Sequence, residues 1–176
     1  MIKIKIKNLY KIFGKNSELS IPLIEKGMGK DELLEKKGHV LGLSNINMDI
    51  EEGEIHVVMG LSGSGKSTLI RHINRLVEPT AGNIIIDDVD ITALDKEALN
   101  NFRKNKTAMV FQSFGLLPHY NILDNVTFGL DIKKIDKKIS KSKGKQWINK
   151  VGLEGYESRF PNELSGGMQQ RAAFCQ

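Results

Sequence analysis

The sequence is poor in cysteine, histidine and long apolar runs, and each shortage excludes a class of protein. Its 176 residues include one cysteine, Cys175, which excludes an internal disulfide and a cysteine-rich metal site. The four histidines show no metal-ligand spacing, which argues against a zinc or iron site. No apolar run approaches the roughly 18 residues of a membrane span. The strict Ile/Lys alternation of residues 2–7 is unlike a signal peptide. We therefore expect a single globular domain, which lies in the cytoplasm or is bound to the cytoplasmic side of another component.

The positive charge of the chain is concentrated in one segment. Net charge is +5, and residues 133–150 contain eight lysines and one acid, Asp136. Apolar residues are interleaved with these lysines, namely Ile135, Ile139, Trp147, Ile148 and Val151. This pattern predicts a helix or helix pair with one buried stripe and a solvated lysine face. No aromatic platform for base stacking accompanies the lysines, so we expect no nucleic-acid partner.

Periodicity gives the coarse order of secondary structure. Alternating or short apolar runs predict strands at 2–7, 43–50, 54–59 and 107–111, and residues 82–91 read as a hairpin that turns at Asp87-Asp88. Helical spacing is found at 30–37, 67–77 and 95–104, with Gly38 as a stop and Asp95 as a cap. The polar, lysine-rich stretch 16–42 reads as an insertion. Together these elements predict a mixed α/β domain with a helical part late in the chain.

A phosphate-binding loop is the strongest local motif. The residues are Gly60, Leu61, Ser62, Gly63, Ser64, Gly65, Lys66 and Ser67, followed by Thr68, and they fit G-x-x-x-x-G-K-[ST]. Glycines let consecutive backbone N–H groups converge on phosphates, and the following helix adds its positive end. Lys66 would reach the β- and γ-phosphates, and the Ser67 hydroxyl would ligate magnesium. An apolar segment before the loop and an amphipathic helix after it supply the expected context.

A second Ser/Gly-rich motif lies near residue 165. The string LSGGMQQR begins at Leu164 and places Ser165, Gly166 and Gly167 directly before a helical segment. A capping serine alone would explain Ser165. The complete string indicates a second helix N-terminus that can bind an anion, with glycines that let the anion approach the backbone closely.

The two motifs together, with Gln112 after the apolar run 107–111, resemble the ABC ATPases. The resemblance implies a P-loop ABC nucleotide-binding domain, with an antiparallel β subdomain, a RecA-like core that is incomplete here, and a helical subdomain. Residues 1–111 would form the first part, with the insertion at about 16–42, and residues 112–176 the second. It also implies ATP and magnesium as ligands and a head-to-tail homodimer, in which Ser165, Gly166 and Gly167 contact the nucleotide of the partner subunit.

Two further positions take their roles from the same resemblance. Gln112 matches the glutamine that contacts magnesium and the attacking water, and its loop faces the membrane subunit. Phe13 matches the aromatic residue that stacks on adenine, although any flat ring would serve and Tyr10 competes for the role. Lys66 and Gln112 would assist catalysis.

The resemblance extends to one branch of the family. The insertion, together with MGLSGSGKSTLIRHINRLVEPTAG and AMVFQSFGLLPH, is similar to the ATPases of glycine betaine/proline importers. It implies permease subunits as direct partners and a substrate-binding protein as an indirect one. It also implies a peripheral position at the cytoplasmic face of the inner membrane.

The chain departs from the family after the second motif. The Asp-Glu strand and the switch histidine that follow LSGGMQQR in the family are absent, so no residue here is assigned as the general base. Because that strand would lie between 54–59 and 107–111, we expect the isolated chain to be unstable or aggregation-prone and to hydrolyse ATP negligibly. Two alternatives stay open: a non-hydrolysing nucleotide-binding fragment, and an ABC protein of the DNA-repair or translation type that has no membrane partner.

Overall fold

The computed structural model describes residues 1–176 as two compact units, residues 1–101 and residues 102–176. The first unit holds an antiparallel sheet and the second is helical. The described elements run in this order: β1 (Ile2–Phe13), η1 (Ser17–Ser20), α1 (Ile21–Glu25), α2 (Lys30–Lys37), β2 (Val40–Glu51), α3 (Lys66–Ile73), β3 (Ala81–Ile86), β4 (Val89–Asp90), α4 (Lys96–Lys106), α5 (Ile122–Ile132), α6 (Lys137–Lys150), η2 (Pro161–Glu163) and α7 (Gly166–Ala173). Helix α4 spans the border between the units.

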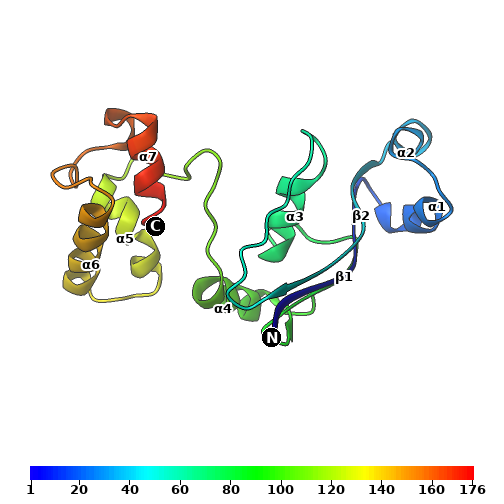
Figure 1. The fold of residues 1–176 in the computed structure, drawn as a ribbon, viewed down its shortest axis with the longest axis horizontal. Helices are drawn as coiled ribbons and strands as arrows, with labels where there is room; N and C mark the ends of the chain where they lie inside the picture. The colour runs from blue at the N-terminus through cyan, green and yellow to red at the C-terminus, as the bar shows by residue number, and fades with distance from the viewer. The chain divides into compact units, whose positions relative to one another are not determined.

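The sheet of the first unit has the order β2-β1-β3-β4, and every neighbouring pair is antiparallel. Figure 1 shows the long β1 and β2 running side by side. The alternation of Ile and Lys correctly predicted the first half of β1, where Ile6 is buried. The strand continues past residue 7 because a bulge at Asn8, with φ 48°, shifts the register and lets both Leu9 and Tyr10 enter the core.

The insertion folds into two short helices and a 3₁₀ turn between β1 and β2 (Figure 1). Helix α2 has the predicted bounds, and Gly38 ends it in the left-handed conformation at φ 65°. The hairpin is also confirmed, since Asp87 and Asp88 take positive φ between β3 and β4. Asp95 caps α4 by accepting from the N–H of Ala98 at 2.8 Å.

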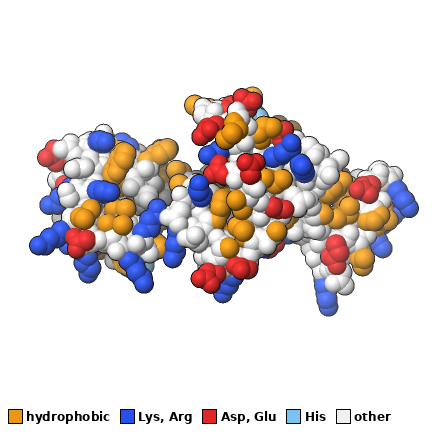
Figure 2. All heavy atoms as spheres, turned by 90° about the horizontal axis from the view of Figure 1, so that it is seen from below, with side chains coloured by type: hydrophobic (Ala, Val, Ile, Leu, Met, Phe, Trp, Pro, Cys, Tyr) orange, Lys and Arg blue, Asp and Glu red, His pale blue; other side chains and the backbone are white.

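The predictions of two strands are wrong. Residues 54–59 and 107–111 form no strand, and Ile55, Val57 and Met59 are 89%, 69% and 86% exposed. An apolar run becomes a buried strand only when neighbours pair with its backbone and cover its side chains, and neither segment has a paired strand beside it. Figure 2 shows exposed apolar surface in several patches among charged side chains. The predicted instability of the isolated chain stays a prediction.

The helix after the phosphate loop is shorter than predicted and buries only part of its apolar face. Helix α3 ends at Ile73 rather than residue 77. Among the apolar residues of the predicted range, Leu69 is buried, whereas Ile70 and Leu76 are 43% and 49% exposed. His72, a polar residue of the same helix, is buried as well.

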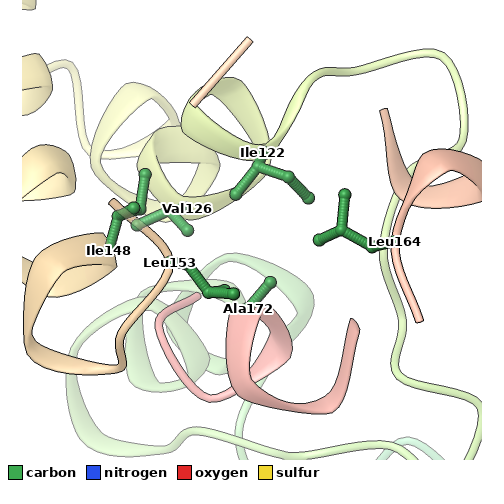
Figure 3. Packing of buried hydrophobic residues seen from close by; sticks show 6 residues of the cluster. All are labelled: Ile122, Val126, Ile148, Leu153, Leu164 and Ala172. Carbon is green, nitrogen blue, oxygen red and sulfur yellow. The ribbon is translucent and has the colours of Figure 1, made fainter. Parts of the chain in front are cut away.

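The helical unit packs around six buried residues from α5, α6, α7 and their connections (Figure 3). Their side chains point toward one another; they are Ile122, Val126, Ile148, Leu153, Leu164 and Ala172. In α6 the predicted stripe is only partly right, because Ile139 and Trp147 are half-exposed while Ser140, Gly144 and Ile148 are buried. A Cβ on Gly144 would lie 2.6 Å from Thr127 Cγ2, so the missing side chain lets α5 and α6 approach closely.

Candidate functional site

The phosphate loop, Gly60–Ser67, turns tightly before α3 and lies against β2. Gly65 precedes the helix at φ 93°, a region that side chains disfavour. A Cβ on Gly65 would also lie 2.5 Å from the carbonyl oxygen of Gly42 in β2. Backbone geometry and space both require glycine here. Gly42, which sequence reasoning missed, is the residue of β2 that Gly65 approaches most closely.

The loop presents several hydrogen-bond donors in one place. The backbone N–H groups of Gly63, Gly65, Lys66 and Ser67 donate to no acceptor within the protein. The Lys66 ammonium lies over the same loop, where it donates to the carbonyls of Gly60 and Leu61 at 2.7 Å each. Unpaired amides, a cation and the positive end of α3 together suit a polyphosphate anion.

A magnesium ion would find few protein ligands at the loop. No group of three His, Cys, Asp or Glu side chains is arranged to hold a metal. The Ser67 hydroxyl, which the motif predicts as a ligand, is exposed in the loop. This fits Mg²⁺, which keeps several waters and is held by one or two side chains plus phosphate oxygens.

The two aromatic candidates for base stacking, Tyr10 and Phe13, differ in burial. Tyr10 is 6% exposed and therefore belongs to the core. Burial raises the pKa of its hydroxyl, which donates to Glu25 Oε1 at 3.4 Å. Phe13 is 43% exposed at the end of β1, with Lys11 Nζ 4.9 Å from its ring centroid. An edge of the Phe13 ring lies against Gly42, where a Cβ would be 2.8 Å from Cε2. Gly42 thus contacts both Phe13 and Gly65.

Gln112 belongs to the helical unit and is exposed in a turn. The structure therefore does not assemble it into one unit with the phosphate loop. The loop that follows Gln112 is fixed by Asn125, a fully buried residue that sequence reasoning missed. Its side chain accepts from the Leu117 N–H at 2.7 Å and donates to the carbonyls of Leu117, Tyr120 and Asn121.

The LSGGMQQR segment divides into an exposed part and a packed part. Ser165 caps α7 by accepting from the Met168 N–H at 3.4 Å. Gly166 and Gly167 are exposed, and a Cβ on either would meet nothing within 4 Å. The three residues predicted to contact nucleotide therefore form an open surface.

The remaining residues of the motif hold that surface in place. Leu164 is buried in the core, and Met168 packs against it. Gln169 donates to the carbonyls of Pro161 and Leu164 at 2.8 and 3.1 Å. Arg171 donates to the carbonyls of Val151 and Gly152 at 2.7 and 3.3 Å, which ties α7 to the end of α6. Packing and hydrogen bonds within the helical unit thus explain this part of the long motif.

Comparison with known proteins agrees with this geometry. The family model described as "ABC transporter" matches residues 43–176, which include both Ser/Gly-rich loops. The chain belongs to the ABC transporter family. The predicted fold class is confirmed, because ABC cassettes are also its structural neighbours.

Two ABC relatives illustrate the similarity. The glycine betaine/proline betaine transport ATP-binding protein ProV of Escherichia coli is 49% identical over 174 residues, 99% of this chain and 44% of ProV. The glycine betaine transport ATP-binding protein OpuAA of Bacillus subtilis is 46% identical over 99% of this chain and 42% of its own length. The chain therefore spans less than half of each relative.

A solved ABC cassette gives the structural match. It is a dimer in a post-hydrolysis state bound to ADP and Pi, and it aligns with a TM-score of 0.80 at 31% identity, over 98% of this chain and 67% of the other. No helix of this ABC chain is long and apolar enough to cross a membrane.

Proposed function

We propose that the chain is the ATP-binding part of an importer ATPase for glycine betaine, proline or related quaternary amines, with a role in osmoprotection. The observation that carries the proposal is the phosphate loop, where unpaired amides and Lys66 converge beside the α3 N-terminus. The solute class is supported by the names of ProV and OpuAA, both glycine betaine transport proteins. Those names also favour a transporter over an ABC protein without a membrane partner.

The loop residues would act by position and charge. The amides of Gly63, Gly65, Lys66 and Ser67 would bind the phosphate oxygens. Lys66 would exchange its two carbonyl partners for the β- and γ-phosphates. Ser67 and Gln112 would hold magnesium, which when bound neutralises the phosphate charge. Phe13 would stack on the adenine ring. Phosphoryl transfer to water depends mostly on such positioning and neutralisation.

The open Ser165–Gly167 surface supports a second half of the site. In a head-to-tail homodimer these residues would contact the ATP bound by the partner copy, in keeping with the dimeric state of the solved cassette. Permease subunits would be the direct membrane partners, a substrate-binding protein an indirect one, and the ATPase would lie at the cytoplasmic face of the inner membrane.

A second candidate function is nucleotide binding without hydrolysis. It is favoured by segments 54–59 and 107–111, which form no strand, and by the lack of a carboxylate cluster. ATP turnover measured alongside ATP binding separates the two, since this candidate predicts binding with no phosphate release.

The proposal is tested by Lys66→Ala in the full chain. Removing the ammonium leaves the phosphate charge without its mobile cation, so ATP binding or hydrolysis should be abolished, as measured by titration calorimetry and phosphate release. The matched control is Lys141→Ala, an exposed lysine of α6. Unchanged ATP affinity together with unchanged turnover in Lys66→Ala would refute the assignment. Solute identity is tested by uptake of labelled glycine betaine and proline in proteoliposomes that contain the permease.

A further inference from the structure

The Phe13 ring is held at its place by neighbours rather than by its own burial. Lys11 Nζ lies over the ring and also donates to the Glu78 carbonyl at 2.8 Å, which keeps the ammonium in place. Gly42 contacts a ring edge. A half-exposed aromatic of this kind keeps its orientation only if the backbone that carries it is fixed.

That backbone is fixed by a residue of the insertion, His39. A Cβ on Gly14, directly after Phe13, would collide with the His39 imidazole ring, so the ring packs against the end of β1. His39 Nε2 lies 3.1 Å from the Lys15 carbonyl oxygen, and Nδ1 lies 2.8 Å from Ser20 Oγ. A carbonyl only accepts, so Nε2 carries a proton, and in the neutral ring Nδ1 accepts from the Ser20 hydroxyl.

The hydrogen bonds of His39 span both ends of the insertion. Lys15 stands where the chain leaves β1, and Ser20 is 2% exposed at the base of the first turn. His39 itself stands where the chain returns, one residue before Val40, which pairs with Phe13. The imidazole therefore closes the insertion at the point where it borders Phe13.

We propose that His39 is a positioning residue for the nucleotide base: by joining Lys15, Ser20 and Gly14 it sets the orientation in which Phe13 meets a purine ring. The inference rests on the proposed function, since it requires Phe13 to be the base platform. It assigns the insertion a role in recognition of the base, with no role in binding of the phosphates. His39 does not contact the phosphate loop in any described hydrogen bond.

The experiment compares ATP with inorganic tripolyphosphate, which carries the same phosphates without a base. Dissociation constants are measured on the full chain for wild type, His39→Ala, His39→Gln and Phe13→Ala. His119→Ala, a histidine of the helical unit, is the matched control. Losing one to two hydrogen bonds should raise the ATP dissociation constant of His39→Ala by about 3- to 10-fold. Tripolyphosphate affinity should stay unchanged, and His39→Gln, whose amide can still donate to Lys15, should recover most of the ATP affinity.

The outcomes separate the inference from the proposed function. If Phe13→Ala weakens ATP but His39→Ala does not, the positioning role is refuted while the base site stands. Equal weakening of ATP and tripolyphosphate by His39→Ala refutes it as well, because a general loss of structure would do the same. If Phe13→Ala leaves ATP affinity unchanged, the proposed base site itself fails and the inference fails with it.

Discussion

Two Ser/Gly-rich loops lead into helices of equal length, α3 and α7, yet Gly65 of the first loop and the two glycines of the second have opposite surroundings. Gly65 lies against the backbone of β2, and Lys66 covers its own loop. Gly166 and Gly167 border open space. The first loop collects its donors within one unit of the chain. The second offers an exposed backbone on a well-packed support, as a surface that meets something outside the unit requires.

The largest expected effect comes from adding a side chain at Gly65, where the phosphate loop lies against β2. Gly65→Ala places a Cβ 2.5 Å from the Gly42 carbonyl oxygen and at an unfavourable φ of 93°. The free energy of unfolding should fall by about 2 kcal/mol or more, because strain and overpacking act together. ATP binding should be lost with it. Chemical denaturation and calorimetry measure both. Wild-type stability in Gly65→Ala would show that the loop does not rest on β2.

Adding a side chain at Gly166, which borders open space, should change function without changing stability. Gly166→Ala has free space for its Cβ, so its free energy of unfolding should stay within about 0.5 kcal/mol of wild type. If this surface approaches the nucleotide of a partner copy, ATP turnover should fall about 10-fold or more while ATP affinity of the single chain is kept. Full turnover in this variant would argue against a nucleotide contact at Gly166.

The smallest expected effect concerns buried polar groups, which also differ between the units. Asn125 of the helical unit is fully hydrogen-bonded, whereas His72 Nε2 in α3 is buried without a partner. His72 Nδ1 donates to the Thr68 carbonyl at 2.7 Å. Because an unsatisfied buried acceptor is costly, His72→Leu should raise the free energy of unfolding by about 1 kcal/mol at pH 7. Urea denaturation measures the change, and a loss of stability instead would show that the Thr68 bond matters more.

The same residue predicts a dependence on pH. Burial lowers the pKa of His72 from its ordinary 6.5, helped by the charge of Lys11, while the carbonyls of Thr68 and Glu78 and the charge of Glu78 oppose the shift. The unfolded chain therefore takes up a proton first. The contribution of neutral His72 to the free energy of unfolding is fully present above pH 6.5. It is lost as the pH falls through the lowered pKa that His72 has in the folded state. His72→Leu should flatten this part of the stability profile. A wild-type profile that is equally flat would contradict the expectation.

Local signals in the sequence predicted local structure well. Helix α2, the Asp95 cap and the Asp87-Asp88 turn are confirmed, because each depends on residues within a few positions of one another. The phosphate loop and the helix after Ser165 were found for the same reason. The roles of the site residues in ligand binding stay predictions.

Features that depend on distant neighbours were missed. The apolar segment 54–59 reads as a buried strand, but burial needs partners that the pattern itself does not supply. In α6 the buried face was set by Gly144, whose small size allows α5 to approach, rather than by the larger Trp147. Gly42 contacts Phe13 and the phosphate loop, and His39 contacts the chain directly after β1; no spacing in the sequence reveals either set of contacts.

The central place of β1 in the sheet has a consequence for biosynthesis. It precedes both of its neighbours in the chain, and it pairs with β2 on one side and with β3, about 80 residues further on, on the other. At roughly 5–20 residues per second, the nascent strand would wait about 4–16 s for its second neighbour. During that time its Ile side chains would be only half covered. The lysines that alternate with them would discourage pairing of this strand with other chains over that interval, since charged side chains on an open strand edge oppose such pairing.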